Sequence, residues 1–332
     1  MAQTGKTRVE VLTGFLGSGK TTLLSGLLSQ GGFADTAVVV NEIGEIGLDH
    51  LLVERRTEQV ALLEGGCLCC EVVDSLPETL LELCRGRAGG DLPPFSRIVI
   101  ETTGLADPGP ILSVLRGSSL LAHFLEPGLV VAALDMTDAE AVTARHPEAL
   151  HQLLLADRVV LTKLDLRGPL TTGEEGWLEG LNPIAEVVSA QDVAADPAIL
   201  LAAPPARHGA AAKPGREHAA RGHHTHGVQA HDLEVRGDVT RAGLAAFAAA
   251  IGHVLGDRLL RCKGVVECGG DPVLVQGVRK RFDFAAADAR QASVAGHLTC
   301  IVQDCEREEI EPLLDWLSVP EGTMPPGAED VS

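Results

Sequence analysis

The feature that most constrains the fold of this chain is a glycine-rich segment close to its N-terminus. Residues 9–24 place an apolar run directly before a turn and a leucine-rich, helix-prone stretch: VEVLTGFLGSGKTTLL. The turn at residues 14–21 fits the G-x-x-x-x-G-K-[ST] pattern of a phosphate-binding loop, which needs a strand before it and a helix after it. The alternative is a flexible glycine-rich turn, and the strand-then-helix context disfavours it.

The same loop indicates which ligand it binds. Its glycines let the backbone turn successive N–H groups toward an anion, and the following helix adds its positive end. Lys20 is placed to reach the β- and γ-phosphates, and the Thr21 hydroxyl is placed to coordinate Mg²⁺ between them. We therefore predict a nucleoside triphosphate with Mg²⁺, bound by these residues of the loop: Gly14, Gly17, Ser18, Gly19, Lys20, Thr21 and Thr22.

Short apolar runs alternate with helical patterns through the first part of the chain. The apolar runs lie at residues 36–40, 59–63, 97–100, 129–134 and 158–161. Residues 75–84 repeat apolar positions at helical spacing. Apolar strands that alternate with helices are typical of a parallel sheet covered on both faces, with function at the carboxyl ends of the strands. We predict an α/β fold of the P-loop NTPase type, with a mainly parallel sheet covered by helices.

Polar residues follow the strand predicted at residues 97–100. Glu101 stands where a carboxylate supports Mg²⁺ through water. Gly104 lies close enough along the chain to offer its N–H to the γ-phosphate. A helix N-cap cluster is the alternative interpretation, because Thr-Thr-Gly also suits a turn.

A second polar segment follows the strand predicted at residues 158–161. Thr162, Lys163 and Asp165 resemble the guanine-binding pattern N-K-x-D. A carboxylate at the position of Asp165 accepts the N1–H and N2–H₂ groups of guanine, which adenine does not offer. The segment therefore favours GTP and GDP as ligands, and a surface segment without a role is the alternative.

The alternation of strands and helices ends near residue 201. Residues 202–230 are rich in Ala, Pro, Gly and His and lack a hydrophobic period, which is typical of a flexible linker. Strand patterns then return at residues 232–236, 259–267, 273–277 and 296–302, and helical patterns at 240–255 and 306–317. We predict a P-loop GTPase domain over 1–201, a His-rich flexible linker over 202–230, a small C-terminal α+β domain with an antiparallel sheet over 231–320, and a disordered tail over 321–332.

Composition excludes several classes of function. A chain of 332 residues, 45% of them hydrophobic, can form one large or two ordinary folded domains. The formal net charge of −19 argues against a nucleic-acid partner, because such binding depends on clustered Lys and Arg. Neither an export signal nor a run of about 18 apolar residues is seen, so we expect a cytoplasmic protein with no membrane span. In that reducing compartment the eight cysteines are expected to be thiols, some of them metal ligands.

Three of these cysteines lie within four positions: Cys67, Cys69 and Cys70. Three thiolates suit Zn²⁺ or a neighbouring transition ion, and a site without a nearby fourth cysteine is open or exchangeable. We expect Glu42, Glu45 or a histidine to complete it, whereas buried or redox-active thiols are the alternative. Metal ligands between two nucleotide-sensing loops would let contacts with the γ-phosphate change the ligand geometry.

Histidines and further cysteines give weaker signals. Six histidines lie in or beside the linker: His208, His218, His223, His224, His226 and His231. Flexible imidazoles collect Zn²⁺, Ni²⁺ or Co²⁺ weakly, and a spacer without a metal-binding role is the alternative. The remaining cysteines are scattered, and we expect Cys268 and the pair Cys300 and Cys305 to be packed side chains, with Cys84 and Cys262 unassigned.

Together these motifs resemble one family. The chain is similar to the zinc-associated, CobW-type branch of the P-loop GTPases, relatives of the HypB and UreG metallocentre-assembly proteins. The resemblance covers nearly the whole chain and rests on GFLGSGKTT at residues 14–22, NEIGE at 41–45, GCLCC at 66–70, ETTG at 101–104 and Lys263-Gly264 in the C-terminal domain. Two positions depart from the family pattern, Ile43 where Phe is common and Thr162 where Asn is usual.

The resemblance implies a GTP-hydrolysing metallochaperone that binds zinc, or a related metal such as Co²⁺ or Ni²⁺, and transfers it to a metalloprotein client. Lys20, Thr21, Glu101 and Gly104 would then serve hydrolysis by a water that the loops and Mg²⁺ position. The transported metal would be held by the residues Cys67, Cys69, Cys70, Glu42 and Glu45. Two alternative functions stay open. One is a cobalt-handling accessory protein for cobalamin synthesis or nitrile hydratase maturation, and the other is a metal buffer regulated by GTP. Formation of a homodimer also stays open.

Overall fold

The fold is that of a computed structural model of the chain. The structure describes residues 6–29, 35–40, 60–62, 72–202, 204 and 227–320. The chain divides into two compact units, one formed by Met1–Pro169 with Val187–Ala203 and the other by Leu170–Glu186 with Pro204–Ser332. Each unit is built around one sheet.

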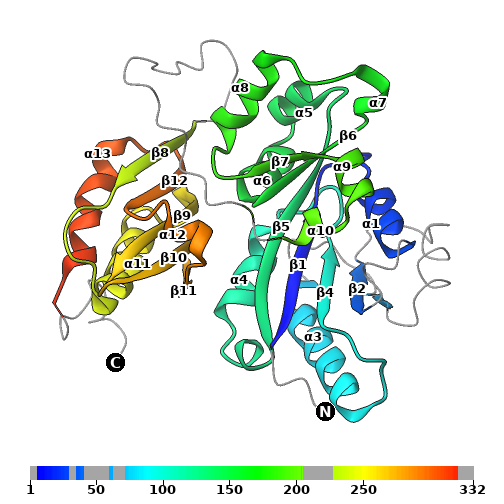
Figure 1. Ribbon diagram of the computed structural model, residues 1–332, viewed down its shortest axis with the longest axis horizontal. Helices are drawn as coiled ribbons and strands as arrows, with labels where there is room; N and C mark the ends of the chain where they lie inside the picture. The colour runs from blue at the N-terminus through cyan, green and yellow to red at the C-terminus, as the bar shows by residue number, and fades with distance from the viewer. Residues whose placement is uncertain are drawn as a thin grey trace. The chain divides into compact units, whose positions relative to one another are not determined.

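The sheet of the first unit has, within the described residues, seven strands in the order β3-β2-β4-β1-β5-β6-β7 (Figure 1). These strands are β1 (Thr7–Thr13), β2 (Thr36–Val40), β3 (Val60–Leu62), β4 (Arg97–Glu101), β5 (Leu125–Asp135), β6 (Arg158–Thr162) and β7 (Glu186–Ser189). From β3 across to β6, neighbouring strands pair in parallel. Figure 1 shows this for β1, β4 and β5, which point the same way and end close to α1.

Helices join these strands and pack against the sheet. They are α1 (Lys20–Ser29), α3 (Val72–Gly89), α4 (Gly109–Gly117), α5 (Ala139–Arg145), α6 (Pro147–Leu155), α7 (Leu164–Arg167), α9 (Ala190–Ala195) and α10 (Ala198–Leu201), with the 3₁₀ turn η1 (Leu121–His123). All five residues of β2 and all five of β6 are buried, as expected for β-branched strands covered on both faces. The predicted α/β fold with a mainly parallel sheet is thus confirmed.

The second unit contains an antiparallel sheet with the strand order β11-β10-β9-β12-β8. Its strands are β8 (Val228–Glu234), β9 (Leu259–Cys268), β10 (Asp271–Val278), β11 (Arg281–Ala286) and β12 (His297–Gln303). Its helical segments are α8 (Thr172–Leu181), α11 (Arg241–Val254), η2 (Gly256–Arg258), α12 (Ala289–Ala292), α13 (Arg307–Ile310) and η3 (Glu311–Ser318). The predicted small α+β domain with an antiparallel sheet is confirmed.

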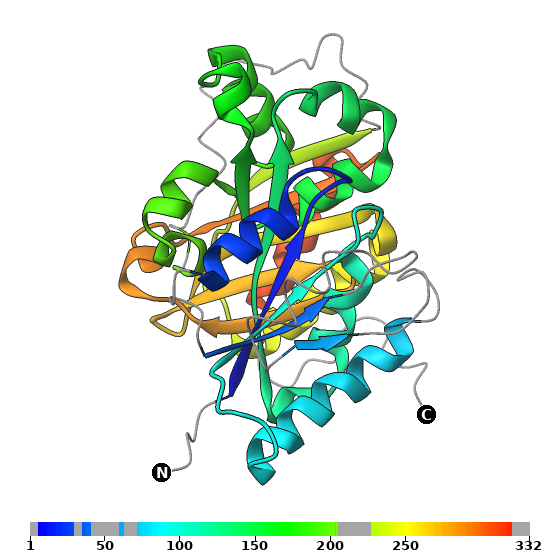
Figure 2. The same ribbon diagram turned by 90° about the vertical axis from the view of Figure 1, so that its right-hand side faces the viewer.

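The core of the second unit lies between this sheet and α11. Phe247 and Ile251 of α11 are buried with Leu317 of η3 and Val275 of β10 in one hydrophobic cluster. Figure 2 shows α11 (yellow) and the segment α13–η3 (red) on the same face of the sheet. The other face of the sheet carries the cross-strand row Asp232, Thr299 and Lys263.

Some elements differ from those predicted. The helix predicted over residues 306–317 is a short α-helix followed by the 3₁₀ segment η3, which has Pro312 in its first turn. Proline has no N–H for an i→i−4 hydrogen bond, so the α-helix cannot continue through it. Strands β7 and β11 were not predicted, because no residue of β7 is fully buried and β11 is mostly exposed. Among the described residues, no helix combines the length and the apolar character that crossing a membrane requires.

Candidate functional site

The glycine-rich loop between β1 and α1 has the backbone geometry that a phosphate-binding loop needs. Gly14, Gly17 and Gly19 have φ angles of 143°, 71° and 87°, values that other residues rarely adopt. A Cβ on Gly14 would lie 2.3 Å from the carbonyl oxygen of Ala133 in β5. Only glycine therefore lets the loop approach the end of this strand.

Lys20 begins α1, and its side chain folds back over the loop. Its Nζ donates hydrogen bonds to the carbonyl oxygens of Gly14 at 2.8 Å and Phe15 at 3.1 Å. The side chain is 8% exposed, so the ammonium group lies within the loop rather than in solvent. A cation held at the mouth of a turn that ends at a helix N-terminus favours an anionic ligand.

Glu101 reaches this loop because β4 lies beside β1 in parallel register, with Leu12 opposite Glu101. The Thr21 hydroxyl donates a hydrogen bond of 2.6 Å to Oε1 of Glu101. Glu101 is 4% exposed. A hydroxyl and a carboxylate are oxygen donors of the kind that Mg²⁺ prefers, so this pair fits the magnesium ion predicted from the sequence.

Gly104 lies directly against the phosphate-binding loop. A Cβ on Gly104 would be 2.7 Å from the backbone nitrogen of Leu16 and 2.8 Å from its Cα. The segment that follows β4 is therefore packed backbone to backbone on the loop, which requires glycine at this position. The hydroxyl of Thr102 adds a hydrogen bond of 2.9 Å to that of Thr13.

Thr162 also contacts the phosphate-binding loop. Its hydroxyl lies 2.8 Å from the carbonyl oxygen of Ser18 and 3.1 Å from that of Leu134. The residue is 5% exposed and packs near Gly19. At this end of β6, Thr162 thus helps to hold the loop in place, while Thr22 on α1 is exposed.

Lys163 forms the turn between β6 and α7 in the left-handed region, with φ of 58°. Its Nζ is 2.6 Å from Oδ2 of Asp135, the last residue of β5. Burial opposes ionisation of Asp135, but hydrogen bonds from Lys163 and Thr137 outweigh it and hold the pKa of this carboxyl below its ordinary value. Asp165 follows in the first turn of α7, where it is exposed.

Two residues near the loop were not among the predicted site residues. Asp135 pairs with Lys163, and Gln152 of α6 contacts the segment around Gly104. Both Asp135 and Gln152 help to line a cavity of about 50 Å³ beside the loop, together with Phe15 and Ser18. The position of Asp135 at the end of an apolar run was a usable signal, whereas Gln152 lies within a helix and carries no local pattern.

The predicted metal ligands Cys67, Cys69, Cys70, Glu42 and Glu45 lie outside the described residues. So do the linker histidines His208, His218, His223, His224 and His226. In the described ranges, no group of three or more His, Cys, Asp or Glu residues could hold a metal ion. The strand ends from which the chain enters the acidic and cysteine-rich segments are described, and Val40 of β2 lies opposite both Leu62 and Glu101.

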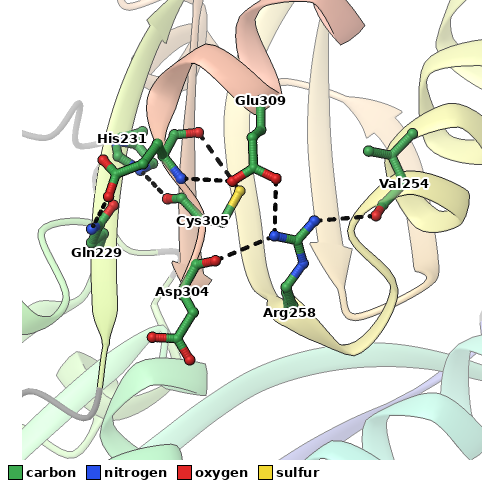
Figure 3. Close-up of polar contacts among 8 residues, drawn as sticks. Gln229, His231, Val254, Arg258, Asp304, Cys305 and Glu309 are labelled. Atoms are coloured by element: carbon green, nitrogen blue, oxygen red, sulfur yellow. Dashed lines mark hydrogen bonds and ion pairs between the residues drawn. The ribbon is translucent and has the colours of Figure 1, made fainter.

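The scattered cysteines are buried free thiols: Cys84, Cys262, Cys268, Cys300 and Cys305. The expectation that Cys268, Cys300 and Cys305 are packed is confirmed. Figure 3 shows Cys305 beside Glu309, with its carbonyl oxygen 2.9 Å from Nε2 of His231. Burial and the neighbouring Glu309 carboxylate raise the pKa of the Cys305 thiol to about 11, which keeps it protonated and a poor metal ligand near neutral pH.

Comparison with known proteins adds to this geometry. Residues 8–189 match the model of the CobW/HypB/UreG nucleotide-binding domain, and residues 228–317 match that of the cobalamin synthesis protein CobW C-terminal domain.

Named proteins and solved structures are also similar to this chain. The zinc chaperone YjiA of Escherichia coli K12 is 40% identical over 161 residues, which are 48% of this chain and 50% of that protein. The zinc chaperone CobW of Pseudomonas aeruginosa is 31% identical over 330 residues, with 85% of this chain and 83% of that protein covered. The crystal structure of a zinc-bound triple mutant of the YjiA GTPase has a TM-score of 0.66 at 26% identity, and covers 95% of this chain and 100% of that chain. The sequence match to YjiA spans about half the length of that relative.

Proposed function

The chain belongs to the CobW/HypB/UreG family, and on that basis we propose that it is a GTPase that carries zinc to a metalloprotein client. The observation that carries the proposal is the hydrogen bond between Thr21 and Glu101 beside a complete phosphate-binding loop. Together they offer backbone N–H groups, a cation and hard oxygen donors, which is the set of groups that a magnesium-bound triphosphate requires.

The described residues account for how hydrolysis would proceed. The Nζ of Lys20, which is 2.8 Å from the Gly14 carbonyl, would donate charge-assisted hydrogen bonds to phosphate oxygens held by the same loop. Mg²⁺ held by Thr21, and through water by Glu101, would neutralise charge that develops on the phosphates. The packing of Gly104 on Leu16 brings its peptide to the same loop, where its N–H supports the γ-phosphate. Water held between these loops would be the nucleophile.

Guanine specificity is proposed to come from the segment that follows β6 and begins α7, where Asp165 is exposed. The Asp165 carboxylate accepts hydrogen bonds from the N1–H and N2–H₂ groups of guanine. Lys163, fixed by its contact of 2.6 Å with Asp135, would pack its aliphatic stem beside the base. Thr162 contributes by holding the carbonyl of Ser18, so a threonine in place of the usual asparagine still supports the loop.

Zinc is the proposed cargo, because the relatives CobW and YjiA are named zinc chaperones. We propose that Cys67, Cys69 and Cys70 bind it with Glu42 and Glu45. The register of the sheet supports a link between the zinc ligands and the nucleotide, because Val40 and Leu62 lie in one row with Glu101. The chain enters both ligand segments from strand ends beside the magnesium site, so γ-phosphate binding can change their geometry.

The wider organisation belongs to the same proposal. The linker predicted over 202–230 ends earlier than expected, because β8 begins at Val228 and pairs with β12. The residues before β8 would act as a linker between a GTPase domain and the C-terminal domain, and residues 321–332 as a tail. The protein would work in the cytoplasm, and formation of a homodimer stays an open part of the proposal. A cobalt-handling accessory protein and a GTP-regulated metal buffer are the competing functions. Turnover that rises with a client protein separates a chaperone from a buffer.

The direct test uses the full chain with Mg²⁺. We expect GTP and GDP to bind at least about tenfold more tightly than ATP, since a carboxylate at Asp165 discriminates by two hydrogen bonds of about 1 kcal/mol each. Phosphate release from GTP should be measurable and should depend on Mg²⁺. Equal affinity for ATP would remove the guanine assignment, and failure to bind any triphosphate would remove the proposed activity.

A further inference from the structure

Helix α6 makes contacts to both loops of the triphosphate site. At its start, the ring of His146 lies 4.6 Å from the ring of Phe15 in the phosphate-binding loop. Further along α6, Nδ1 of His151 is 3.6 Å from Oδ2 of Asp107, which lies in the segment after β4. Gln152, the next residue of α6, contacts the segment after β4 through two hydrogen bonds.

The carboxamide of Gln152 holds the backbone around Gly104. Its Nε2 donates hydrogen bonds to the carbonyl oxygen of Gly104 at 3.1 Å and to that of Ala106 at 2.9 Å. Both amide hydrogens are therefore used on one short segment. The side chain is 1% exposed, so water does not compete for these two bonds.

The remaining oxygen of this amide fixes its orientation. Oε1 of Gln152 is buried and has no hydrogen-bond partner among the described residues. Turning the amide over would place that oxygen against two carbonyl oxygens, which would repel it and leave both carbonyls unpaired. Gln152 consequently acts only as a double donor to the segment around Gly104.

The third constraint on Gly104 comes from the opposite side. Its Cα packs on the backbone of Leu16, where a Cβ would come within 2.7 Å of the nitrogen. Two carbonyls held from α6 and one Cα held by the phosphate-binding loop restrict rotation of the backbone at Gly104. The peptide that carries the Gly104 N–H is held as well, because its carbonyl oxygen, that of Thr103, accepts a hydrogen bond of 3.2 Å from the N–H of Ala106. The direction of the Gly104 N–H is then set before any ligand binds.

We propose that Gln152 is a positioning residue that aims the Gly104 N–H at the γ-phosphate. This inference rests on the proposed function and deepens it. Because GDP has no γ-phosphate, the contribution of Gln152 is specific to the triphosphate state. Helix α6 thereby links recognition of the γ-phosphate to the phosphate-binding loop that it also contacts.

The test is a comparison of Gln152→Met with wild type. Methionine has nearly the same length and volume but donates no hydrogen bond, so the core stays filled while both donors are lost. We expect affinity for a non-hydrolysable GTP analogue to fall roughly tenfold, which is about 1.4 kcal/mol, while affinity for GDP stays within about twofold. Gln152→Glu, which puts carboxylate oxygens against the two carbonyls, should show a larger loss of the same kind.

Thr143→Val is the matched control. Thr143 is buried and lines the same cavity, and among the described residues its hydroxyl donates only to carbonyls of its own helix α5, those of Ala139 and Glu140. Its replacement should leave the ratio of the two affinities unchanged. Equal weakening of GDP and GTP analogue by Gln152→Met, or unfolding of both Gln152 variants without nucleotide, would mark Gln152 as merely structural and overturn the inference. Failure of the wild type to bind GTP would instead defeat the proposed function, and this inference with it.

Discussion

At the residue scale, the site depends on single polar contacts made across neighbouring strand ends. Thr21 donates to Glu101, Thr162 contacts the Ser18 carbonyl, and Lys163 pairs with Asp135. Each contact joins residues from different elements, so each reports whether the sheet has its proper register. A substitution at one of these contacts therefore tests one side chain without changing the backbone.

Lys20→Ala should abolish triphosphate binding while the protein stays folded. The ammonium serves the ligand with charge-assisted hydrogen bonds of about 1.5–3 kcal/mol each, so two of them amount to at least roughly a hundredfold in affinity. Titration calorimetry with a GTP analogue measures the loss, and circular dichroism checks the fold. Lys280→Ala, an exposed lysine of the second unit, is the control and should bind as wild type does. Unchanged GTP affinity in Lys20→Ala would contradict the assignment of the loop.

The pair formed by Lys163 and Asp135 predicts a dependence of stability on pH. The Asp135 pKa lies below its ordinary value of 3.8, so the stabilisation is present above that value and is lost as the pH falls through the lowered pKa. We expect Asp135→Asn to destabilise the protein by at most about 1 kcal/mol near neutral pH, because the pair is partly exposed. The difference in free energy of unfolding between wild type and variant, measured by urea unfolding, should disappear below about pH 4.

Lys163→Met tests the same pair from the other side. It should remove the stabilisation that the Asp135 carboxylate gains from the pair. In the double variant, Asp135→Asn should then change the free energy of unfolding little further. A gap that widens in acid would show that the pKa of Asp135 is raised in the folded state.

At the element scale, strands with β-branched, apolar sequences were predictable and exposed ones were not. The strand predicted at residues 36–40 is β2. Its apolar pattern was a clear signal because Ala37, Val38 and Val39 are completely buried. Strand β11 is mostly exposed and its sequence gives no comparable signal. The helix predicted at residues 75–84 extends over Val72–Gly89, because helix ends depend on tertiary contacts as well as on periodicity.

Site residues divide in the same way. Lys20, Thr21 and Glu101 could be predicted, because a motif and parallel strand ends bring them together. Gln152 could not, because its partners Gly104 and Ala106 lie 48 and 46 residues away in the chain. Tertiary packing decides which face of a helix meets which loop. The hydrophobic periodicity of a single sequence does not reveal this contact.

Deletion of residues 207–226 is a test at the scale of an element. It removes the linker histidines His208, His218, His223, His224 and His226. We expect fewer weakly bound zinc ions, with GTP hydrolysis and the tight zinc site unchanged, because flexible imidazoles bind zinc singly and weakly. Zinc titration against a competing chelator measures both classes of site. Replacing the same five histidines by glutamine keeps the length and should give the same result, whereas loss of the tight site would place ligands of that site in the linker.

At the scale of the whole molecule, the account requires nucleotide and metal to be linked. If γ-phosphate contacts change the geometry of the zinc ligands, zinc must change the affinity for GTP by the same factor. Couplings of this kind are usually about 5- to 150-fold, or about 1–3 kcal/mol. Replacing Cys67, Cys69 and Cys70 together by Ser should erase the coupling and leave metal-free GTP binding nearly intact, because serine is a poor ligand for soft ions.

The most direct test of this claim is a zinc titration of the full chain held with GDP or with a non-hydrolysable GTP analogue, under reducing conditions. The account predicts zinc affinities that differ between the two states by roughly 5- to 150-fold in the wild type and by less than about twofold in the triple serine variant. Identical zinc affinities in the two nucleotide states of the wild type would contradict it.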